Sequence, residues 1–332
     1  MQQTHLKPKV VVEGVKEIEK YLPHRFENVL LDKVEAFEDN EEKLLAKIEL
    51  TITENDPEGR NIFLIKNQEN KWVYNAHMFP ENLALGALVY LNTIRGDGHG
   101  AYFSTISNFQ KTGDVLASEK LQATIHLKRG KGSFQTFSGK VYNPQGALVA
   151  ETEVMAFIFK LAEAPAAGEG EKKKSDPPQK TIEQAVDFSK IDNKQKNMFF
   201  AEKIVHFNPE DNSAVISFTY PKDHPFVKGH FPGNPIMMGV CQWMAMGDAL
   251  DALALELKAK GKVNTVFTLT ADIELLKEDG VVAAEAKGFV KNYKVVGSGF
   301  KPRVVSTKKC GFRDMIVPGD VIYQKITNVQ IS

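Results

Sequence analysis

The sequence of 332 residues predicts an α+β fold built from two tandem units, in each of which antiparallel strands enclose one apolar helix. Three observations predict this architecture: a segment near the middle that cannot enter a core, an internal repeat on either side of it, and strand-like segments separated by turns. A chain of this length also exceeds one ordinary domain and suggests about two units of roughly 150 residues each.

The segment that cannot enter a core covers residues 162–180. It contains no large apolar residue and is rich in Ala, Pro, Gly, Glu and Lys. Such a composition buries too little apolar surface to offset the loss of chain entropy, and it is typical of a flexible linker. The sequence therefore predicts a first unit over 1–161, a linker over 162–180 and a second unit over 181–332.

The internal repeat is clearest in two motifs that each begin with a histidine and end with a glycine. His77 precedes Gly86 by nine positions in the first copy, and His230 precedes Gly239 by nine positions in the second. An apolar run follows each motif, and the second run predicts a helix over 240–257. Because this helix is apolar on nearly every side, it has to be enclosed on nearly every side.

Strand-like segments in the first unit can supply that enclosure. Residues 121–127, 133–142 and 147–159 are rich in β-branched and aromatic residues and are separated by turns that contain glycine. This pattern is typical of an antiparallel meander. A sheet rolled around the central helix is the architecture that the pattern favours.

The second unit departs from the first in the spacing of its later elements. A Gly-Asp turn at 113–114 follows Gly86 by 27 residues, whereas the matching turn at 319–320 follows Gly239 by 80 residues. Two explanations stay open. Either the second unit is truncated, or the hairpin-like stretch 272–289, with its turn at 278–280, supplies rearranged strands from an unusual place in the chain order.

Residues 229–240 read Gly-His-Phe-Pro-Gly-Asn-Pro-Ile-Met-Met-Gly-Val and resemble the central motif of the β-hydroxyacyl-[acyl-carrier-protein] dehydratases, the FabA/FabZ family. Residues 18–25 are similar to the N-terminal helix of that family, and residues 317–320 to its Pro-Gly-Asp signature. The resemblance implies the hot-dog fold, a curved antiparallel sheet wrapped around a central helix. Two tandem copies imply a double hot dog whose halves pair as an intramolecular pseudo-dimer, with further homo-oligomerisation left open.

The resemblance also implies roles for the two ends of the second motif. His230 would be the catalytic base, because an imidazole can move a proton near neutral pH. The N–H of Gly239 would donate to the thioester carbonyl, because the first N–H groups of a helix lack intrahelical partners and lie at its positive end. His77 is the weaker counterpart in the first copy, because Met78, Glu81 and Asn82 replace the tight Pro/Gly turn of the family, and a structural histidine is the alternative there.

The acid that the family carries fourteen positions after the histidine is missing from both copies. Met244 occupies that position in the second copy and Leu91 in the first. Asp248, one helical turn beyond Met244, is a candidate substitute acid, and Asn92 is a candidate hydrogen-bond donor. The alternative for Asp248 is a solvated charge near the helix end.

Pairing of the two halves predicts composite sites. We expect His230 to face the first helix around Tyr90, Leu91 and Asn92, and His77 to face Gln242, Met244 and Asp248. The predicted catalytic residues are His230, Gly239, Asp248, Asn92 and His77. The predicted substrate-binding residues are Phe231, Pro232, Gly233, Met238, Val240, Met244, Gly86, Tyr90 and Leu91.

Composition limits the other functional classes. Lysine plus arginine equals aspartate plus glutamate at 42 each, so no global charge draws the chain to nucleic acid or to an anionic membrane. The longest mainly apolar run, 83–94, is shorter than the ~20 residues of a membrane span, and no secretion signal opens the chain. Cys241 and Cys310 form neither a disulfide framework nor a metal-ligand spacing. We therefore expect a cytoplasmic protein with no metal site.

Three functions of different classes stay open at this point. The first is a β-hydroxyacyl thioester dehydratase of fatty-acid or polyketide-type biosynthesis, whose substrate is carried on the phosphopantetheine of an acyl-carrier protein or coenzyme A and which needs no other cofactor. The second is a thioesterase, and the third is a non-catalytic module that binds an acyl chain or a carrier. A cationic segment is the candidate surface for the carrier protein, and it comprises Lys301, Arg303, Lys308, Lys309 and Arg313.

Overall fold

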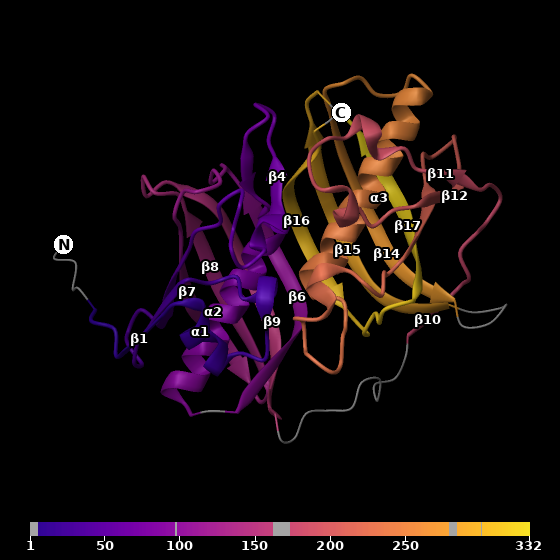
Figure 1. The fold of residues 1–332 in the computed structure, drawn as a ribbon. Coiled ribbons are helices and arrows are strands. Elements are labelled where there is room, and N and C mark those ends of the chain that lie inside the picture. The colour runs from indigo at the N-terminus through magenta and orange to yellow at the C-terminus, as the bar shows by residue number, and fades with distance from the viewer. Residues whose placement is uncertain (1–5, 97, 162–172, 279–283, 300) are drawn as a thin grey trace.

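The computed structural model describes residues 6–96, 98–161, 173–278, 284–299 and 301–332, and these residues form two sheet-and-helix halves joined edge to edge (Figure 1). Fifteen strands of the described residues belong to one sheet, in which all the strand pairs are antiparallel. Each half of the sheet encloses one apolar helix. The predicted hot-dog architecture, in two tandem copies, is confirmed.

In the chain order of the first half, the helix comes after the third strand of the large sheet and before the strand that lies at the centre of the molecule. Its elements are β1 (Val10–Glu13), α1 (Val15–Ile18), η1 (Glu19–Tyr21), η2 (Phe26–Asn28), β2 (Lys33–Ala36), β3 (Leu44–Leu50), η3 (Arg60–Phe63), β4 (Leu64–Lys66), β5 (Trp72–Tyr74), η4 (Ala76–Met78), α2 (Phe79–Ile94), β6 (His99–Lys111), β7 (Leu121–Lys131), β8 (Phe134–Tyr142) and β9 (Leu148–Lys160).

The second half repeats the architecture around a longer helix. Its elements are β10 (Lys174–Ser175), β11 (Gln184–Ala185), η6 (Phe188–Lys190), η7 (Lys196–Met198), β12 (Lys203–Phe207), β13 (Ala214–Thr219), η8 (Pro225–Val227), α3 (Gly239–Ala259), β14 (Phe267–Glu278), β15 (Ala284–Gly297), β16 (Arg303–Phe312) and β17 (Val321–Ile331).

The order of strands across the sheet mirrors itself about the centre, but the chain visits the places in a different order. From the outer edge to the centre the first half runs β1-β2-β3-β7-β8-β9-β6, and the second runs β11-β12-β13-β17-β14-β15-β16. In the first half the strand after the helix, β6, goes directly to the centre. In the second half β14 and β15 come first and β16 then reaches the centre. The explanation that the 272–289 stretch supplies strands from an unusual place is therefore confirmed, although its turn at 279–280 lies outside the described residues.

The two halves meet where β6 pairs with β16, so the sheet continues across the molecule (Figure 1). The register places Ile106 opposite Cys310 and Phe109 opposite Thr307. The indole of Trp243, in α3, donates to the hydroxyl of Thr307 over 3.2 Å and packs against Phe109. Buried apolar residues of both halves consequently form one continuous core.

The helices begin and end for local reasons. Pro80 lies in the first turn of α2, where its missing N–H costs nothing. Gly86 allows α2 to approach the sheet closely, since a Cβ there would lie 2.6 Å from the side chains of Ile48 and Ile125. Helix α3 ends before Gly261, which adopts a positive φ of 70°. No helix of the described residues is long and apolar enough to cross a membrane.

Part of the predicted linker, residues 162–172, lies outside the described residues. Residues 174–175 form β10, which pairs with β15. This part of the segment therefore lies against the sheet of the second half rather than free of it.

Candidate active site

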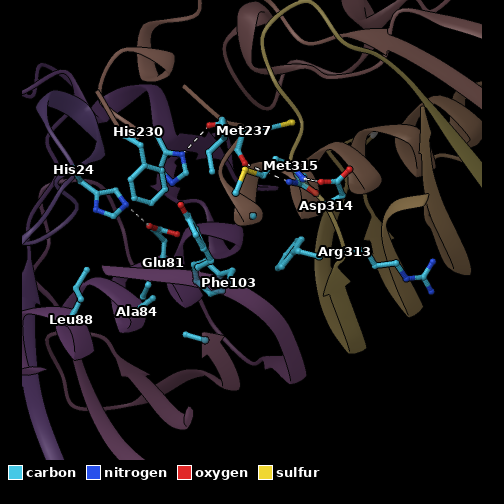
Figure 2. Close-up of a pocket in the computed structure, with 18 of the residues that line it drawn as sticks. His24, Glu81, Ala84, Leu88, Phe103, His230, Met237, Arg313, Asp314 and Met315 are labelled. Carbon is cyan, nitrogen blue, oxygen red and sulfur yellow. Dashed lines mark hydrogen bonds and ion pairs between the residues drawn. The ribbon is translucent and has the colours of Figure 1, made fainter. Parts of the chain in front are cut away.

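A cavity of about 530 Å³ lies between the two halves and is lined by residues of both. Helix α2 and strands β6 and β9 supply one side, and the loop before α3, the start of α3 and the segment after β16 supply the other. Figure 2 shows His24, Glu81 and His230 gathered in one part of the cavity, with Arg313 and Asp314 in another. The site is therefore composite within a single chain, as the pairing of two hot dogs predicts.

His230 is held by the loop that connects η8 to α3. Its backbone N–H donates to the carbonyl of Phe226 over 3.2 Å, and its Nδ1 lies 2.9 Å from the carbonyl oxygen of Ile236. Because a carbonyl can only accept, Nδ1 carries the proton and Nε2 keeps its lone pair. Burial lowers the pKa of His230 to about 4, so the ring is neutral at neutral pH and can accept a proton.

Glu81, in the first turn of α2, is the acid that accompanies His230. Its side chain is 3% exposed, and burial raises its pKa to about 8. The positive end of the helix favours a carboxylate, but the cost of burying a charge outweighs this effect. Glu81 is therefore protonated at neutral pH and can donate a proton, while His230 in the same cavity can accept one.

His24 completes a cluster of three titratable side chains. It follows η1 in the first half, and its ring centroid lies 5.2 Å from that of His230. Its Nε2 lies 3.6 Å from Oε1 of Glu81. Burial, followed by the charges of His230 and Arg25, lowers the pKa of His24 well below its usual value. No role for His24 was predicted from the sequence.

Gly239 supplies the main-chain donor of the site. It is the first residue of α3, so its N–H has no acceptor within the helix. A Cβ at this position would lie 3.2 Å from both Phe103 and Phe312, which shows how closely the cavity wall approaches the backbone. The glycine therefore opens the helix end to a small group such as a carbonyl oxygen.

The two sides of the cavity differ in polarity. The side formed by the first half is apolar beyond Glu81, and its residues are Ala84, Leu85, Leu88, Ala101 and Ala156. The other side carries charges, on Lys173, Glu285, Arg313 and Asp314. The cavity therefore has an apolar side and a charged side around His230 and Glu81.

A second pocket lies at the place that the internal repeat relates to the first, with α3 as its helix wall. Side chains nearly fill it, and its volume is about 40 Å³. His77 lies in it with both ring nitrogens engaged: Nδ1 is 2.9 Å from Oδ1 of Asn75 and Nε2 is 2.6 Å from the hydroxyl of Tyr293. Burial and the charge of Lys194 lower the pKa of His77 to about 3. The hypothesis that His77 is catalytic is wrong for this geometry, because its lone pair already accepts from Tyr293.

Equivalent helix positions show why the acid seemed to be missing. Glu81, Ala84, Leu85 and Leu88 of α2 line the first cavity, and Met244, Gly247, Asp248 and Asp251 of α3 line the second pocket. The spacing of the two sets is the same, so Glu81 corresponds to Met244. This correspondence spans 163 residues, whereas the pairing of His77 with His230 spans 153. The predicted register of the repeat was therefore ten residues in error.

Asp248 and Asn92, which were predicted to assist His230, lie outside its site. Asp248 pairs with Lys194 and accepts from the N–H of Phe200 over 2.7 Å in the second pocket. Asn92 donates to the carbonyls of Tyr21 and His99 near the end of α2. Neither residue lines the cavity of His230. The prediction that either one assists His230 is wrong.

The remaining predicted residues divide between the two pockets and the core. His77 does face Met244 and Asp248, but Gln242 lines the first cavity. Phe231 lines that cavity, as predicted, with a positive φ of 59°. The predicted substrate-binding residues that do not line it are Pro232, Gly233, Met238, Val240, Met244, Gly86, Tyr90 and Leu91.

The predicted cationic surface is dispersed. Arg313 lines the first cavity and pairs with Glu274 over 3.1 Å. Lys301 and Arg303 line the second pocket. Lys308 and Lys309 are exposed on β16. These five residues therefore do not form one patch beside the active cavity.

Comparisons with known proteins find similarity to dehydratases. A family model described as ApeI-like, ApeI dehydratase, matches residues 206–269. The 3-hydroxyacyl-[acyl-carrier-protein] dehydratase FabZ of Geobacillus thermodenitrificans is 26% identical over 164 residues, which cover 46% of this chain and 97% of the relative. FabZ of Halalkalibacterium halodurans is 28% identical over 145 residues, which cover 43% of this chain and 97% of the relative.

Two solved structures are also similar. The dehydratase heterocomplex ApeI:P from Xenorhabdus doucetiae has a TM-score of 0.35 and 14% identity, covering 44% of this chain and 93% of its own. A structure described as giving insights into dehydratase substrate selection for the borrelidin and fluvirucin polyketide synthases has a TM-score of 0.40 and 10% identity, covering 89% and 94%.

The fold and the composite cavity define a double hot dog with a dehydratase-like site. Its sequence is similar to the ApeI-like family model and to FabZ dehydratases. The sequence of its second half carries the motif histidine, and the first half carries the acid.

Proposed function

We propose that this protein is a β-hydroxyacyl thioester dehydratase of fatty-acid or polyketide-type biosynthesis, with His230 as base and Glu81 as acid. The observation that carries the proposal is the presence, in one buried cavity, of an imidazole held neutral and a carboxyl held protonated at neutral pH. Elimination of water needs these two groups in these two protonation states.

The reaction balances with these two groups. Nε2 of His230 removes the proton from C2 of the acyl chain, and the electrons of that C–H bond form the C2=C3 double bond. The C3–O bond breaks, and the hydroxyl leaves as water after it takes the proton of Glu81. The products are a trans-2-enoyl thioester and water, and a proton returned from His230 to Glu81 restores the starting state.

The Gly239 N–H would stabilise the charge that develops on the thioester oxygen while C2 loses its proton. A fixed donor at a helix N-terminus is suited to this task, because it requires no reorganisation during the reaction. Oxyanion donors of this kind contribute on the order of 10²–10³ in rate. The chemistry uses acid, base and donor groups alone, so we propose no metal and no redox cofactor.

The polarity of the cavity orients the substrate. With its carbonyl at Gly239, the acyl tail would extend along α2 from Glu81 towards Leu88, a distance of about 10 Å at the helical rise per residue. Small side chains at Ala84, Ala101 and Ala156 leave room on this side. The phosphopantetheine arm of an acyl-carrier protein or coenzyme A would leave past Arg313 and Lys173, where cations can meet its phosphate.

The test is hydration and dehydration of a trans-2-enoyl thioester, followed by its ultraviolet absorption, with free thiol measured in parallel. We expect loss of the absorption band without thiol release, and loss of turnover in His230→Ala and in Glu81→Gln. His77→Gln, in the second pocket, is the matched control for removal of a buried imidazole and should retain turnover per folded molecule.

Other outcomes decide against the proposal. Thiol release that depends on His230 would establish a thioesterase, and no reaction with any chain length or carrier would favour a binding module. The main reason to favour a binding module was the missing acid, and Glu81 removes that reason. Full turnover of Glu81→Gln would show that another group is the acid.

A further inference from the structure

We propose that His24 is a positioning residue for the acid: its Nε2–H holds the Glu81 carboxyl and stabilises the carboxylate that forms when Glu81 gives up its proton. The inference deepens the proposed function and rests on it for the identity of the acid. The contact itself does not depend on the reaction, so it can be tested without substrate.

In the described part of the chain, His24 is the ionisable side chain that lies within ion-pair distance of Glu81. Its Nε2 lies 3.6 Å from Oε1, and Oε2 of Glu81 has no hydrogen-bond partner (Figure 2). The remaining residues of α2 that line the cavity are Ala84, Leu85 and Leu88, which offer no donor. A carboxylate formed here without a donor would be a buried and uncompensated charge. A shift of a few tenths of an ångström brings the imidazole N–H into hydrogen-bond range.

The position of His24 is fixed by main-chain contacts across the two halves. Arg25, the next residue, donates its backbone N–H to the carbonyl of Gly229 over 2.9 Å, and its guanidinium holds the carbonyl of His24 over 2.7 Å. Asn28 donates to the carbonyl of Phe226 over 3.0 Å. Gly229 has no room for a Cβ beside Arg25 and Asn28. The segment that carries His24 is therefore anchored to the loop that carries His230.

The direction of the hydrogen bond follows from the chemistry. If His24 presented a lone pair to Glu81, the carboxyl would donate to His24 rather than to the leaving hydroxyl, and the resulting carboxylate would face no donor. With the proton on Nε2, Nδ1 carries the lone pair and remains without a partner in this structure. The ring then donates to Glu81 both before and after proton transfer.

Other charged groups near Glu81 act in the same site and have to be considered. His230 lines the same cavity (Figure 2), and the buried thiol of Cys241 in α3 interacts with the charge of Glu81. Burial holds the pKa of that thiol well above its usual value, so it brings no negative charge. Lys173, Glu285, Arg313 and Asp314 line the opposite side of the cavity. His24 is the imidazole that touches both catalytic residues.

The experiment compares His24→Phe, which keeps the ring volume, with His24→Gln, which keeps an N–H donor. Loss of a hydrogen bond to a charged group is expected to lower kcat by about ten- to a hundredfold with little change in KM. The alkaline limb of the rate profile should move up by about one pH unit in His24→Phe, because the carboxylate loses its donor. His24→Gln should restore the limb to its original position.

A substrate-free measurement separates this inference from the proposed function. The infrared band of the protonated carboxyl, assigned by its absence in Glu81→Gln, should persist to higher pH in His24→Phe than in the parent. His224→Phe is the control, because His224 is also buried and packed against aromatic rings but lies outside the cavity. It should leave the band unchanged.

The outcomes are distinct. A band that titrates alike in the parent and in His24→Phe, or that shifts to lower pH, overturns the inference. If the parent is inactive but the band shifts as expected in His24→Phe, the role of His24 stands and the proposed dehydratase function is rejected. A uniform fall in kcat with an unmoved alkaline limb would show that His24 only supports the fold.

Discussion

The two pockets between the halves occupy equivalent places but contain opposite chemistry. The first has a cavity of about 530 Å³, with His230 and Glu81 facing each other, whereas the second is reduced to about 40 Å³. Methionine at 244 stands where the first pocket has its acid. Lys194 and Asp248 form a buried ion pair in the space that a substrate would need. One pocket of the duplicated fold is therefore an open cavity with an imidazole and a carboxyl, and the other is filled by packed side chains.

This difference shows that each half contributes one part to one site. The second half carries the imidazole and the helix end, and the first half carries the acid and the apolar wall. A half taken separately would lack either the base or the acid. The junction at β6 and β16, which sets the two halves in register, is thus a requirement of the site as well as of the core.

Moving the acid between the pockets gives the largest expected change. Glu81→Gln should lower kcat by about 10²–10⁴-fold, because the leaving hydroxyl loses its proton donor. The double variant Glu81→Met, Met244→Glu should stay inactive, because His77 has no free nitrogen to act as base. Enoyl-thioester hydration measures both. Recovery of activity in the double variant would show that the second pocket can work as a site.

The same Glu81→Gln substitution should stabilise the fold at alkaline pH. The pKa of Glu81 is about 8 in the folded protein against an ordinary 4.5, so stability falls as the pH rises between these values. Gln at 81 removes this loss, and the difference should reach several kcal/mol above pH 8. Urea unfolding at pH 5 and pH 9 measures it; equal effects at both pH values would contradict the buried protonated acid.

Breaking the ion pair of the second pocket should affect stability and spare the chemistry. Asp248→Ala leaves Lys194 buried without a partner and should destabilise the protein by about 3–5 kcal/mol. The double variant Asp248→Leu, Lys194→Met should recover most of this loss, because both charges are removed. Urea unfolding gives the free energies, and turnover per folded molecule should stay near the parent value. A specific loss of turnover would return Asp248 to the active site.

The pH dependence of kcat/KM should show the two catalytic groups as opposite limbs. Below about pH 4 His230 becomes protonated and loses its function as base, and above about pH 8 Glu81 ionises and loses its function as acid. Activity should therefore fall about tenfold per pH unit beyond each limb. In His77→Gln the profile should be unchanged, because the buried ring of His77 takes no part. A displaced limb in that variant would link the two pockets.

The smallest effect concerns the length of the acyl tail. Ala84→Leu narrows the apolar side of the first cavity beyond Glu81 and should reduce kcat/KM for ten-carbon substrates by about tenfold. Four-carbon substrates are the internal control and should be nearly unaffected, since they end before this position. Equal losses for both lengths would show that the tail does not extend along α2.

Much of this site could be predicted from the sequence, because its signals are local. The motif from His230 to Gly239 is continuous in the chain, so the base and the helix end could be recognised together. Strand segments such as 121–127 carry a pattern of β-branched and aromatic residues that is independent of the partner. These elements were predicted within a few residues of their observed ends.

The acid could not be found in this way, because its partner lies in the other half. Spacing within the first copy suggested His77 as the counterpart of His230, and the equal nine-residue intervals concealed a register error of ten residues. One signal was available: Glu81 is the charged residue of a mainly apolar helix, where an unpaired carboxyl is costly. For His24 the signal was its place in residues 18–25, the segment that is similar to the N-terminal helix of the family.

The sequence by itself indicated two tandem units, an apolar helix in each and an imidazole just before the second helix, because local periodicity and turn residues encode these features; the hot-dog fold followed from the resemblance of residues 229–240 to a known family. Tertiary packing decided which helix positions face which pocket, since the rotation of α2 against the second half depends on contacts such as Gly86 against Ile48 and Ile125. That rotation buries Glu81 beside His230 and places Asp248 with Lys194. Burial in turn sets the protonation states of Glu81 and His230, and the extent of burial cannot be read from the order of residues in the chain.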